Sequence, residues 1–469
     1  MKNIDIAIIG SGMGGAMLAS LNKDKNIVVF EKDMNLGGCA STFKRFGNYF
    51  NTGATTFVGY EDNHILKKIF DKACVKPDIL QSEIAIRTIQ NKKVVDRVGN
   101  FEEFLSKLNS IYYHKNNRIF WKQIKEIDEK FWELKHIYFA KYGINAYLKT
   151  SFFLAELLKK FGAILFKTAD SYINEVLNGI SKEYKAFIDS QLLITLQTTS
   201  KGLSLLAMAL GLSYPFHKVF YANGGMGKII EELVKDVNVH KKEEIISIQR
   251  YEDKYRLVST KDEYIASKVV LNSTVFESGK LFVDEDIKKY YESFSFSDQS
   301  AFVVYLKLDS KENFLQHYQI ILNEIIPNTI SNSFFVSISH KEDEKLSKNG
   351  YSLTISTHSK AIFWEGLTKE DYENKKLETQ DFIINEFLKN FDFVKKEQIT
   401  LSFSATSKTF NRYINRTNCG GKPITFKNIL ELPSCNTPFK NLYNVGDSVF
   451  AGQGWPGVAI GVDVLNKML

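Results

Sequence analysis

The opening of the chain combines a buried strand, a glycine-rich turn and a helix in an order that few folds accommodate. The apolar run 4–9 is typical of a parallel strand covered on both faces. It leads into GSGMGG at residues 10–15, which has the spacing G-x-G-x-x-G. The first glycine permits a tight turn, the second lets backbone N–H groups approach a pyrophosphate, and the third lets the helix pack closely on the strand. The sequence therefore predicts a site for an adenine dinucleotide, with the helix N-terminus facing the phosphates.

A second strand, predicted over residues 27–30, ends at Glu31, twenty-one residues after Gly10. A carboxylate at this position holds the ribose hydroxyls of an adenine dinucleotide. The same carboxylate repels a 2′-phosphate, so NADP is disfavoured. NAD and FAD both stay open at this point.

The composition is that of an ordinary globular protein, because 44% of the 469 residues are hydrophobic and 25% are charged. The net charge of +7 is spread without a long basic run, which argues against a nucleic-acid partner and leaves contact with an anionic membrane surface open. The four cysteines lie far apart without zinc spacing, so we expect no metal site and a reducing compartment. With no export signal and no apolar run long enough to span a bilayer, we expect a cytoplasmic protein, with peripheral membrane contact as an option.

The segment from about 101 to 216 is predicted to be helical and aromatic. Within 150–166 the polar residues Glu156, Lys159 and Lys160 share one stripe and the rest is largely apolar. We interpret this helix as a core helix of a lid. Membrane docking and a substrate-channel wall are the alternatives.

Alternating apolar and polar residues predict three half-buried antiparallel strands, at 300–308, 332–340 and 351–358, which we interpret as the floor of a substrate domain. A capping-box-like segment at 368–371 predicts the start of a helix that runs to about residue 391. Further elements are expected in the dinucleotide part: a helix from about Lys228, strands at 237–248 and 267–272, and a hairpin of 255–259 with 263–266.

The last twenty-nine residues, 441–469, read as a strand, Gly446–Asp447, a glycine-rich turn and an apolar helix from about Val458. In a flavin site, Asp447 would accept a hydrogen bond from the ribityl chain or reach the pyrophosphate through water. The helix N-terminus would stabilise the negative charge of a reduced flavin. A C-terminal packing helix is the alternative.

Motifs at four places across the chain match one flavoprotein family. They are GSGMGG with GGCASTFKRFGNYFNTGA at 10–54, NGGM at 223–226, the stretch TFNRY with Arg416, Gly420, Gly421 and Pro423, and NVGDSVFAGQGWPGV at 444–458. In these motifs the chain resembles bacterial carotenoid desaturases and carotenoid isomerases, within the amine-oxidase-like flavoproteins. NAD domains normally lack the second glycine doublet, so the resemblance implies FAD.

The resemblance implies an α/β fold, in which a Rossmann-type FAD-binding domain is interleaved with an α+β substrate domain that contains an antiparallel sheet and a helical, apolar lid. The FAD-binding domain is expected over 1–75, 218–280 and 405–469, and the substrate domain over 76–217 and 281–404. The cofactor-binding residues carried over from the family motifs are Gly10, Ser11, Gly12, Met13, Gly14, Gly15, Glu31, Lys32, Gly38, Cys39, Ser41, Thr42, Thr55, Ile245, Gly446, Asp447 and Val458.

The predicted function is an FAD-dependent oxidoreductase that desaturates, saturates or isomerises a long apolar isoprenoid or polyene. Asn51, Ala451 and Trp455 depart from the family pattern, which puts the substrate in doubt. An oxidase of an amine or a porphyrinogen and a flavoprotein without turnover are the alternatives. The cofactor supplies most of the chemistry, and we assign no catalytic residue.

Four further side chains have a structural and a functional interpretation. His340 and His358 end strands of the substrate sheet, and we expect satisfied histidines rather than cavity groups. Cys39 is expected to pack beside the pyrophosphate rather than to anchor the flavin or act as a redox thiol. Trp455 fits a core position and a platform beside the flavin ring equally.

Overall fold

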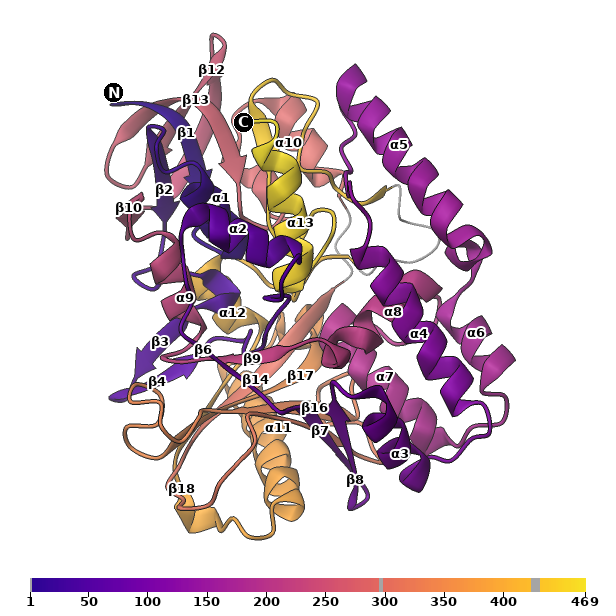
Figure 1. Ribbon diagram of the computed structural model, residues 1–469. Coiled ribbons are helices and arrows are strands. Elements are labelled where there is room, and N and C mark those ends of the chain that lie inside the picture. Colours follow the sequence, from indigo (N-terminus) through magenta and orange to yellow (C-terminus); the bar gives the residue numbers. More distant parts are fainter. Residues whose placement is uncertain (1, 295–297, 423–430) are drawn as a thin grey trace.

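A seven-stranded sheet gathers the two ends of the chain (Figure 1). The structure, a computed structural model, describes residues 2–294, 298–422 and 431–469, so Pro423 lies outside the described residues. In this sheet β1 (Lys2–Ile9) lies between β2 (Ile27–Glu31) and β13 (Glu263–Leu271), and the three run parallel. The C-terminal strand β19 (Leu442–Asn444) is parallel to β13. The carboxyl ends of these strands therefore share one edge, where open α/β sheets bind their ligands.

The rest of this sheet departs in two places from the sequence prediction. The predicted second strand of the hairpin, 263–266, and the predicted strand 267–272 are one continuous strand, β13. The predicted strand 237–248 is two strands, β10 (Asn238–Lys241) and β11 (Ile245–Tyr251), because the chain turns at Lys242, whose φ is +53°. The predicted hairpin is confirmed as the antiparallel pair of β12 (Lys254–Ser259) with β13.

Helices from both ends of the chain cover the sheet together. The helix α1 (Met13–Leu21) contacts α13 (Gly454–Asn466), α2 (Ile65–Ala73) and α9 (Met226–Leu233). In Figure 1 the yellow α13 lies beside α1 and α2. The helix α13 begins four residues before the predicted Val458, since proline, here Pro456, is compatible with the first turn of a helix.

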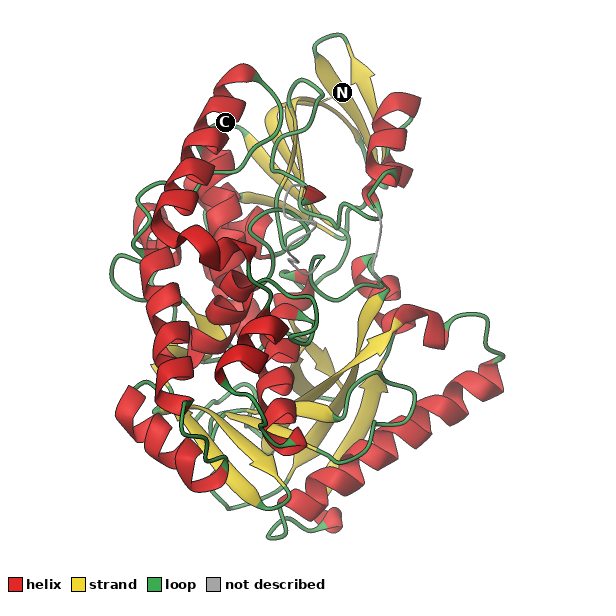
Figure 2. Cartoon of the chain, turned by 90° about the vertical axis from the view of Figure 1, so that its right-hand side faces the viewer, coloured by secondary structure: helices red, strands yellow, loops and turns green. Residues whose placement is uncertain are grey.

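A second seven-stranded sheet lies at the other end of the molecule (Figure 2). Its order is β18-β14-β17-β16-β15-β7-β8, and β15 pairs parallel with β7, so the sheet is mixed rather than purely antiparallel. The strands are β7 (Ile84–Gln90), β8 (Lys93–Val98), β14 (Gln299–Leu308), β15 (His317–Ile321), β16 (Ser333–Ile338), β17 (Tyr351–Lys360) and β18 (Ile399–Ala405).

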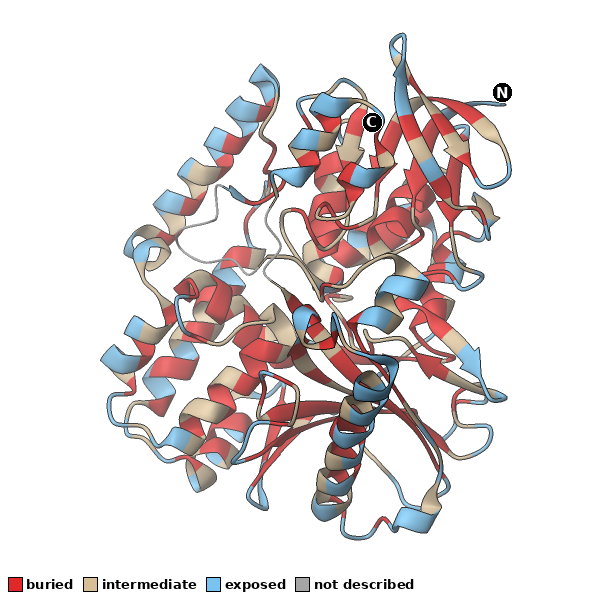
Figure 3. Cartoon of the chain, turned by 180° about the vertical axis from the view of Figure 1, so that it is seen from behind, coloured by how far each residue is buried: buried red, intermediate tan, exposed pale blue. Residues whose placement is uncertain are grey.

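The prediction of half-buried strands in this sheet is wrong, because its central strands are covered on both faces. Every residue of β16 is buried, serines included. Figure 3 shows most of the strand residues of this sheet in the colour of buried residues. On one face, α11 (Lys369–Asn390) packs Ile383 and Phe387 into a core with residues of the sheet. The predicted start of this helix is confirmed: the side chain of Thr368 accepts a hydrogen bond from the N–H of Asp371.

The middle of the chain is helical, as predicted, but its apolar helix is not a core helix. The helix α5 (Ile144–Phe161) ends where Gly162 has a φ of +48°, and a 3₁₀ turn (Gly162–Phe166) follows. Figure 1 shows α5 at the edge of the molecule, and one of its faces is exposed. Among the described residues, no helix is long and apolar enough to cross a membrane.

The remaining elements are short sheets and helices that connect the two large sheets. The strands are β3 (Thr42–Arg45), β4 (Asn48–Asn51), β5 (Phe57–Val58), β6 (Ile79–Gln81) and β9 (Val219–Ala222). The helices are α3 (Phe101–Ile111), α4 (Asn117–Trp132), α6 (Ala169–Val176), α7 (Lys182–Leu196), α8 (Leu205–Ser213), α10 (Glu285–Glu292) and α12 (Ser407–Ile414).

Candidate functional site

A cavity of about 180 Å³, called here the dinucleotide cavity, lies at the carboxyl edge of β1 and β2. Thirteen of the sequence-predicted cofactor residues line it, and they come from four separate parts of the chain. They are Gly10, Ser11, Gly12, Met13, Gly14, Glu31, Lys32, Gly38, Cys39, Ile245, Gly446, Asp447 and Val458.

The other four predicted residues lie outside this cavity. Gly15 packs under the turn, because a Cβ there would come within 2.4 Å of the carbonyl oxygen of Gly10. Thr42 accepts a hydrogen bond from the N–H of Gly227, and Ser41 bonds the hydroxyl of Thr52, so both hold the β3–β4 hairpin in place. Thr55 lines the larger cavity described below.

Asn272, which sequence reasoning missed, holds the glycine turn. Its Nδ2 donates to the carbonyl of Gly10 at 3.0 Å. A Cβ on Gly12 would lie 2.9 Å from the same Nδ2, and a Cβ on Gly14 would lie 2.9 Å from the N atom of Gly446. Because Asn272 ends the predicted strand 267–272, its place at the carboxyl edge was the available signal. The glycine turn at 10–15 is thus closely packed against the end of β13 and against the C-terminal motif.

The carboxylate of Glu31 is fixed at the end of β2. One oxygen accepts from the N–H and the hydroxyl of Ser11, at 3.0 and 2.6 Å, and the other accepts from the N–H of Asp33 at 2.9 Å. Glu243 and Glu244 line the same cavity. Three of the five carboxylates that line this cavity, Glu31, Glu243 and Glu244, lie near the end of β2, and they disfavour a ligand with an additional phosphate on its ribose.

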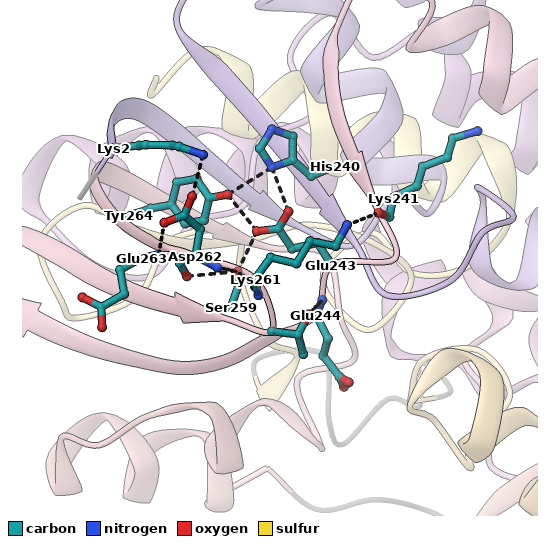
Figure 4. Close-up of polar contacts among 11 residues, drawn as sticks. Lys2, His240, Lys241, Glu243, Glu244, Ser259, Lys261, Asp262, Glu263 and Tyr264 are labelled. Atoms are coloured by element: carbon teal, nitrogen blue, oxygen red, sulfur yellow. Dashed lines mark hydrogen bonds and ion pairs between the residues drawn. The ribbon is translucent and has the colours of Figure 1, made fainter.

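A polar network supports the corner between β10 and β11 beside this cavity (Figure 4). Glu243 accepts from the hydroxyls of Ser259 at 2.6 Å and of Tyr264 at 2.7 Å, and it pairs with His240 at 3.1 Å. Burial raises the pKa of Glu243, but these hydrogen bonds outweigh burial and lower it overall. The corner therefore carries a fixed negative charge.

Asp447 is held by Arg416, a contact that sequence reasoning did not assign. Both carboxylate oxygens accept from Nη1 of Arg416, at 3.2 and 3.1 Å, and the same guanidinium donates to the carbonyls of Asn418 and Gly420. Cys39 lies beside this ion pair, and burial raises the pKa of its thiol. A protonated thiol agrees with the interpretation of Cys39 as a packing residue.

A second, larger cavity of about 470 Å³, called here the apolar cavity, continues from the first one. Six residues line both: Met13, Cys39, Ile414, Arg416, Asp447 and Gly454. The walls of the apolar cavity come from α4, α5, α8 and the second sheet, and include Phe131, Phe139, Phe153, Leu157, Leu210, Val303 and Phe335.

His340, His358 and Trp455, the other side chains with two interpretations besides Cys39, are placed by the structure as follows. His358 lines the apolar cavity, against the prediction, while His340 lies outside it. Burial lowers the pKa of His358 to about 4, so the ring is neutral. Trp455 is 1% exposed and packs edge-on against Phe57 with centroids 5.0 Å apart, yet it also lines the cavity.

One end of the apolar cavity is polar. The ring of His217 donates to Asp128 at 2.5 Å and to Glu61 at 3.3 Å, and the indole N–H of Trp132 donates to Asp128 at 3.1 Å. The ring of His64 lies 4.2 Å from that of Trp132. We call these five residues the polar end. Its two histidines were not singled out by sequence reasoning, because their partners are distant in the chain.

Comparisons with known proteins agree with this geometry. A family model described as an NAD(P)-binding Rossmann-like domain matches residues 8–73. Chloroplastic prolycopene isomerases of Daucus carota and Arabidopsis thaliana are 26% and 27% identical to this chain. These matches cover 98% and 97% of this chain and 78% and 80% of the relatives. The resemblance to carotenoid isomerases and desaturases is confirmed.

Solved structures with the same fold extend over the whole chain. An oxidoreductase from Methanosarcina mazei has a TM-score of 0.66 at 17% identity, covering 99% of this chain and 100% of its own. A putrescine oxidase variant has a TM-score of 0.64 at 12% identity, covering 100% and 98%. The predicted fold class is confirmed, and the relatives and the fold together bear out an FAD-dependent oxidoreductase.

The charge of His217 gives a testable pH dependence. Burial lowers its pKa, but the bonds to Asp128 and Glu61 raise it overall to about 10, above the ordinary 6.5. Its contribution to stability is therefore complete below about pH 6.5 and is lost as pH rises through 10. We predict that His217→Gln lowers the free energy of unfolding by roughly 2 kcal/mol at pH 6, the scale of hydrogen bonds to a charged group. The difference shrinks toward pH 10.

Urea unfolding of both proteins between pH 5.5 and 10 measures this difference. His114→Gln, a histidine outside both cavities, is the control and leaves the pH dependence unchanged. A gap between wild type and His217→Gln that stays constant over this range would contradict the assigned charge.

Proposed function

We propose that this chain is an FAD-dependent oxidoreductase that acts on a long apolar isoprenoid or polyene, by desaturation, saturation or isomerisation. The observation that carries the proposal is the continuity of the two cavities. A cavity built around a dinucleotide-binding turn opens, at Cys39, Arg416 and Asp447, into a cavity whose walls are mainly aromatic and aliphatic. The volume of the apolar cavity lies in the range of small-molecule sites.

The residues of the dinucleotide cavity fit FAD. Gly38 lines it, and a Cβ built there has no protein atom within 4 Å, so a side chain would stand in open space that a ligand needs. The turn at Gly12 presents the N-terminus of α1, and Glu31 presents a carboxylate for the ribose. We assign the other lining residues from the sequence prediction to the same cofactor. Ser41, Thr42 and Gly15 lie outside the dinucleotide cavity and hold in place the hairpin and the turn that form it.

We also propose the domain division on this basis. The FAD-binding domain comprises 1–75, 218–280 and 405–469, and the substrate domain comprises 76–217 and 281–404. The sheet that contains β1, β13 and β19 supports the first grouping, and the sheet from β7 to β18 supports the second.

When bound, FAD supplies the hydride chemistry that alters a carbon–carbon bond. The chain's own residues bind the cofactor and the substrate and orient them toward each other. The N-terminus of α13 lies at the junction of the cavities, where Gly454 lines both, and its dipole favours negative charge there. Arg416 holds the carboxylate of Asp447 in one position. The apolar walls from α4, α5 and α8 exclude water from the substrate.

Anaerobic bleaching of the flavin tests the function. For desaturation, we expect the yellow flavin absorbance of the purified protein to fall on addition of partly saturated carotenoids in detergent micelles. For saturation, we expect chemically reduced flavin to regain its yellow absorbance with a polyene, and for isomerisation we expect the cis–trans composition of the polyene to change with no net change in the flavin. In each case putrescine has no effect. Bleaching by putrescine or a porphyrinogen alone would favour the alternative oxidase. Absence of bound flavin even after reconstitution would contradict every enzymatic assignment.

Two substitutions test the cofactor site. Gly12→Val places a side chain against Asn272 and into the pyrophosphate approach, and Glu31→Ala removes the ribose partner. We predict that each abolishes FAD retention without unfolding the chain, as measured by flavin absorbance per protein and by circular dichroism. The matched control is Gly99→Val, an exposed glycine whose added Cβ meets only an ordinary contact of 3.7 Å. Normal flavin content in Gly12→Val would refute the turn assignment.

We further propose that α5 contacts an anionic membrane surface. On its outer face Ile144 is 82%, Tyr147 67% and Phe152 76% exposed, while Phe153 and Leu157 on the inner face line the apolar cavity. Two lysines of the same helix, Lys149 and Lys159, are exposed and can meet lipid phosphates. An apolar substrate could then pass from lipid to the cavity along one helix.

Liposome flotation at low salt tests this contact. We predict that the protein floats with vesicles of phosphatidylglycerol and phosphatidylcholine, and that the double variant Tyr147→Ser, Phe152→Ser floats several-fold less. Leu377→Ser removes an exposed apolar side chain from α11 and serves as the control. Protein that stays at the bottom with anionic vesicles would contradict the proposal.

A further inference from the structure

The polar end gathers ionisable side chains at one end of a cavity whose walls are mainly apolar. Its side chains come from three parts of the chain. Glu61 and His64 directly precede α2, Asp128 and Trp132 lie on α4, and His217 precedes β9. His64, Asp128, Trp132 and His217 all line the cavity. The chemistry proposed above for the junction with the dinucleotide cavity does not use them. We therefore consider what these four side chains could bind.

His64 has a donor without a partner. Its Nδ1 accepts from the N–H of Leu66 at 3.3 Å, which caps α2 and leaves the hydrogen of the neutral ring on Nε2. Burial lowers the pKa of His64 to about 4, so the ring is neutral at physiological pH. His64 is 9% exposed, and among the described residues Nε2 has no hydrogen-bond partner. A pure hydrocarbon in the cavity would leave this donor unsatisfied.

Asp128 supplies the complementary acceptor. Each of its oxygens receives one hydrogen bond, from Trp132 and from His217, and a carboxylate oxygen can accept a second one. The group of Glu61, Asp128 and protonated His217 carries a net charge of −1. Three charged groups also act on the pKa of His64: His217 and Lys68 lower it, and Glu61 raises it. A ligand with its own carboxylate would meet repulsion from Asp128.

We propose that the substrate of this cavity is a polyene alcohol, whose terminal hydroxyl accepts from Nε2 of His64 and donates to the carboxylate of Asp128. A hydroxyl satisfies both groups at once, whereas a hydrocarbon satisfies neither and an acid is repelled. The inference rests on the proposed function, because it takes the apolar cavity as the polyene site. Leaving a buried polar group unpaired costs enough to separate affinities by about tenfold or more.

A matched ligand series tests the proposal on the flavin-loaded protein, in the dark and without reductant. The probes are all-trans-retinol, all-trans-retinoic acid and the hydrocarbon that carries a methyl group in place of the alcohol. Quenching of tryptophan fluorescence, with Trp132 in the cavity wall as a reporter, gives each dissociation constant. We expect retinol to bind about tenfold more tightly than either of the others.

Variants separate this preference from general apolar binding. His64→Asn keeps an N-cap acceptor for α2 but lacks Nε2–H. We expect the ratio of the dissociation constants of hydrocarbon and alcohol to fall toward one in this variant, while the dissociation constant of the hydrocarbon is unchanged. Asp128→Asn strengthens binding of the acid. His114→Asn is the matched control, because the Nδ1 of His114 also accepts from the N–H two residues on, outside both cavities.

The outcomes distinguish this inference from the proposed function. Equal affinity for alcohol and hydrocarbon in the wild type, or an unchanged preference in His64→Asn with normal flavin content, overturns the inference and leaves the polyene site intact. Failure of all three probes to bind overturns both.

Discussion

The close approach of three backbone segments at the first glycine turn organises this molecule. The turn after β1 packs against Asn272 at the end of β13 and against Gly446 after β19, with no room for a Cβ at Gly12 or Gly14. Since β13 pairs with both β1 and β19, residues hundreds of positions apart share one edge. The two ends of the chain thus complete a single site, and the intervening segments are left to form the second sheet and the helical wall.

That arrangement sets what the site can do. The dinucleotide cavity is lined by backbone, carboxylates and glycines, whereas the cavity it opens into is lined mainly by carbon. The ion pair of Arg416 and Asp447 lies at the boundary. Farther along, the polar end places His64, Asp128 and His217 in the wall of the same cavity. The layout suits a long apolar molecule that is altered at one place and recognised at another.

The sequence predicted the local parts of this site well, because glycines, strand ends and the acid after β2 have roles that short spacing reveals. It predicted β1, β13 and α11 closely. It did not predict Asn272, Arg416 or the polar end, since these contacts join segments far apart in the chain. The alternation in β16 looked half-buried, but serines can be buried when their hydroxyls find a partner, as the hydroxyl of Ser333 does with that of Ser331 just before the strand. The exposed face of α5 shows that apolar residues alone do not mark a core helix.

The most direct measurement of the central claim is an experimental structure of the protein loaded with FAD. The account predicts that the pyrophosphate lies on the turn at Gly10–Gly15, the ribose at Glu31, and the flavin ring at the junction beside Asp447 and Gly454, facing the apolar cavity. A flavin ring directed away from that cavity, or a dinucleotide bound without contact to the residues after β19, would contradict it.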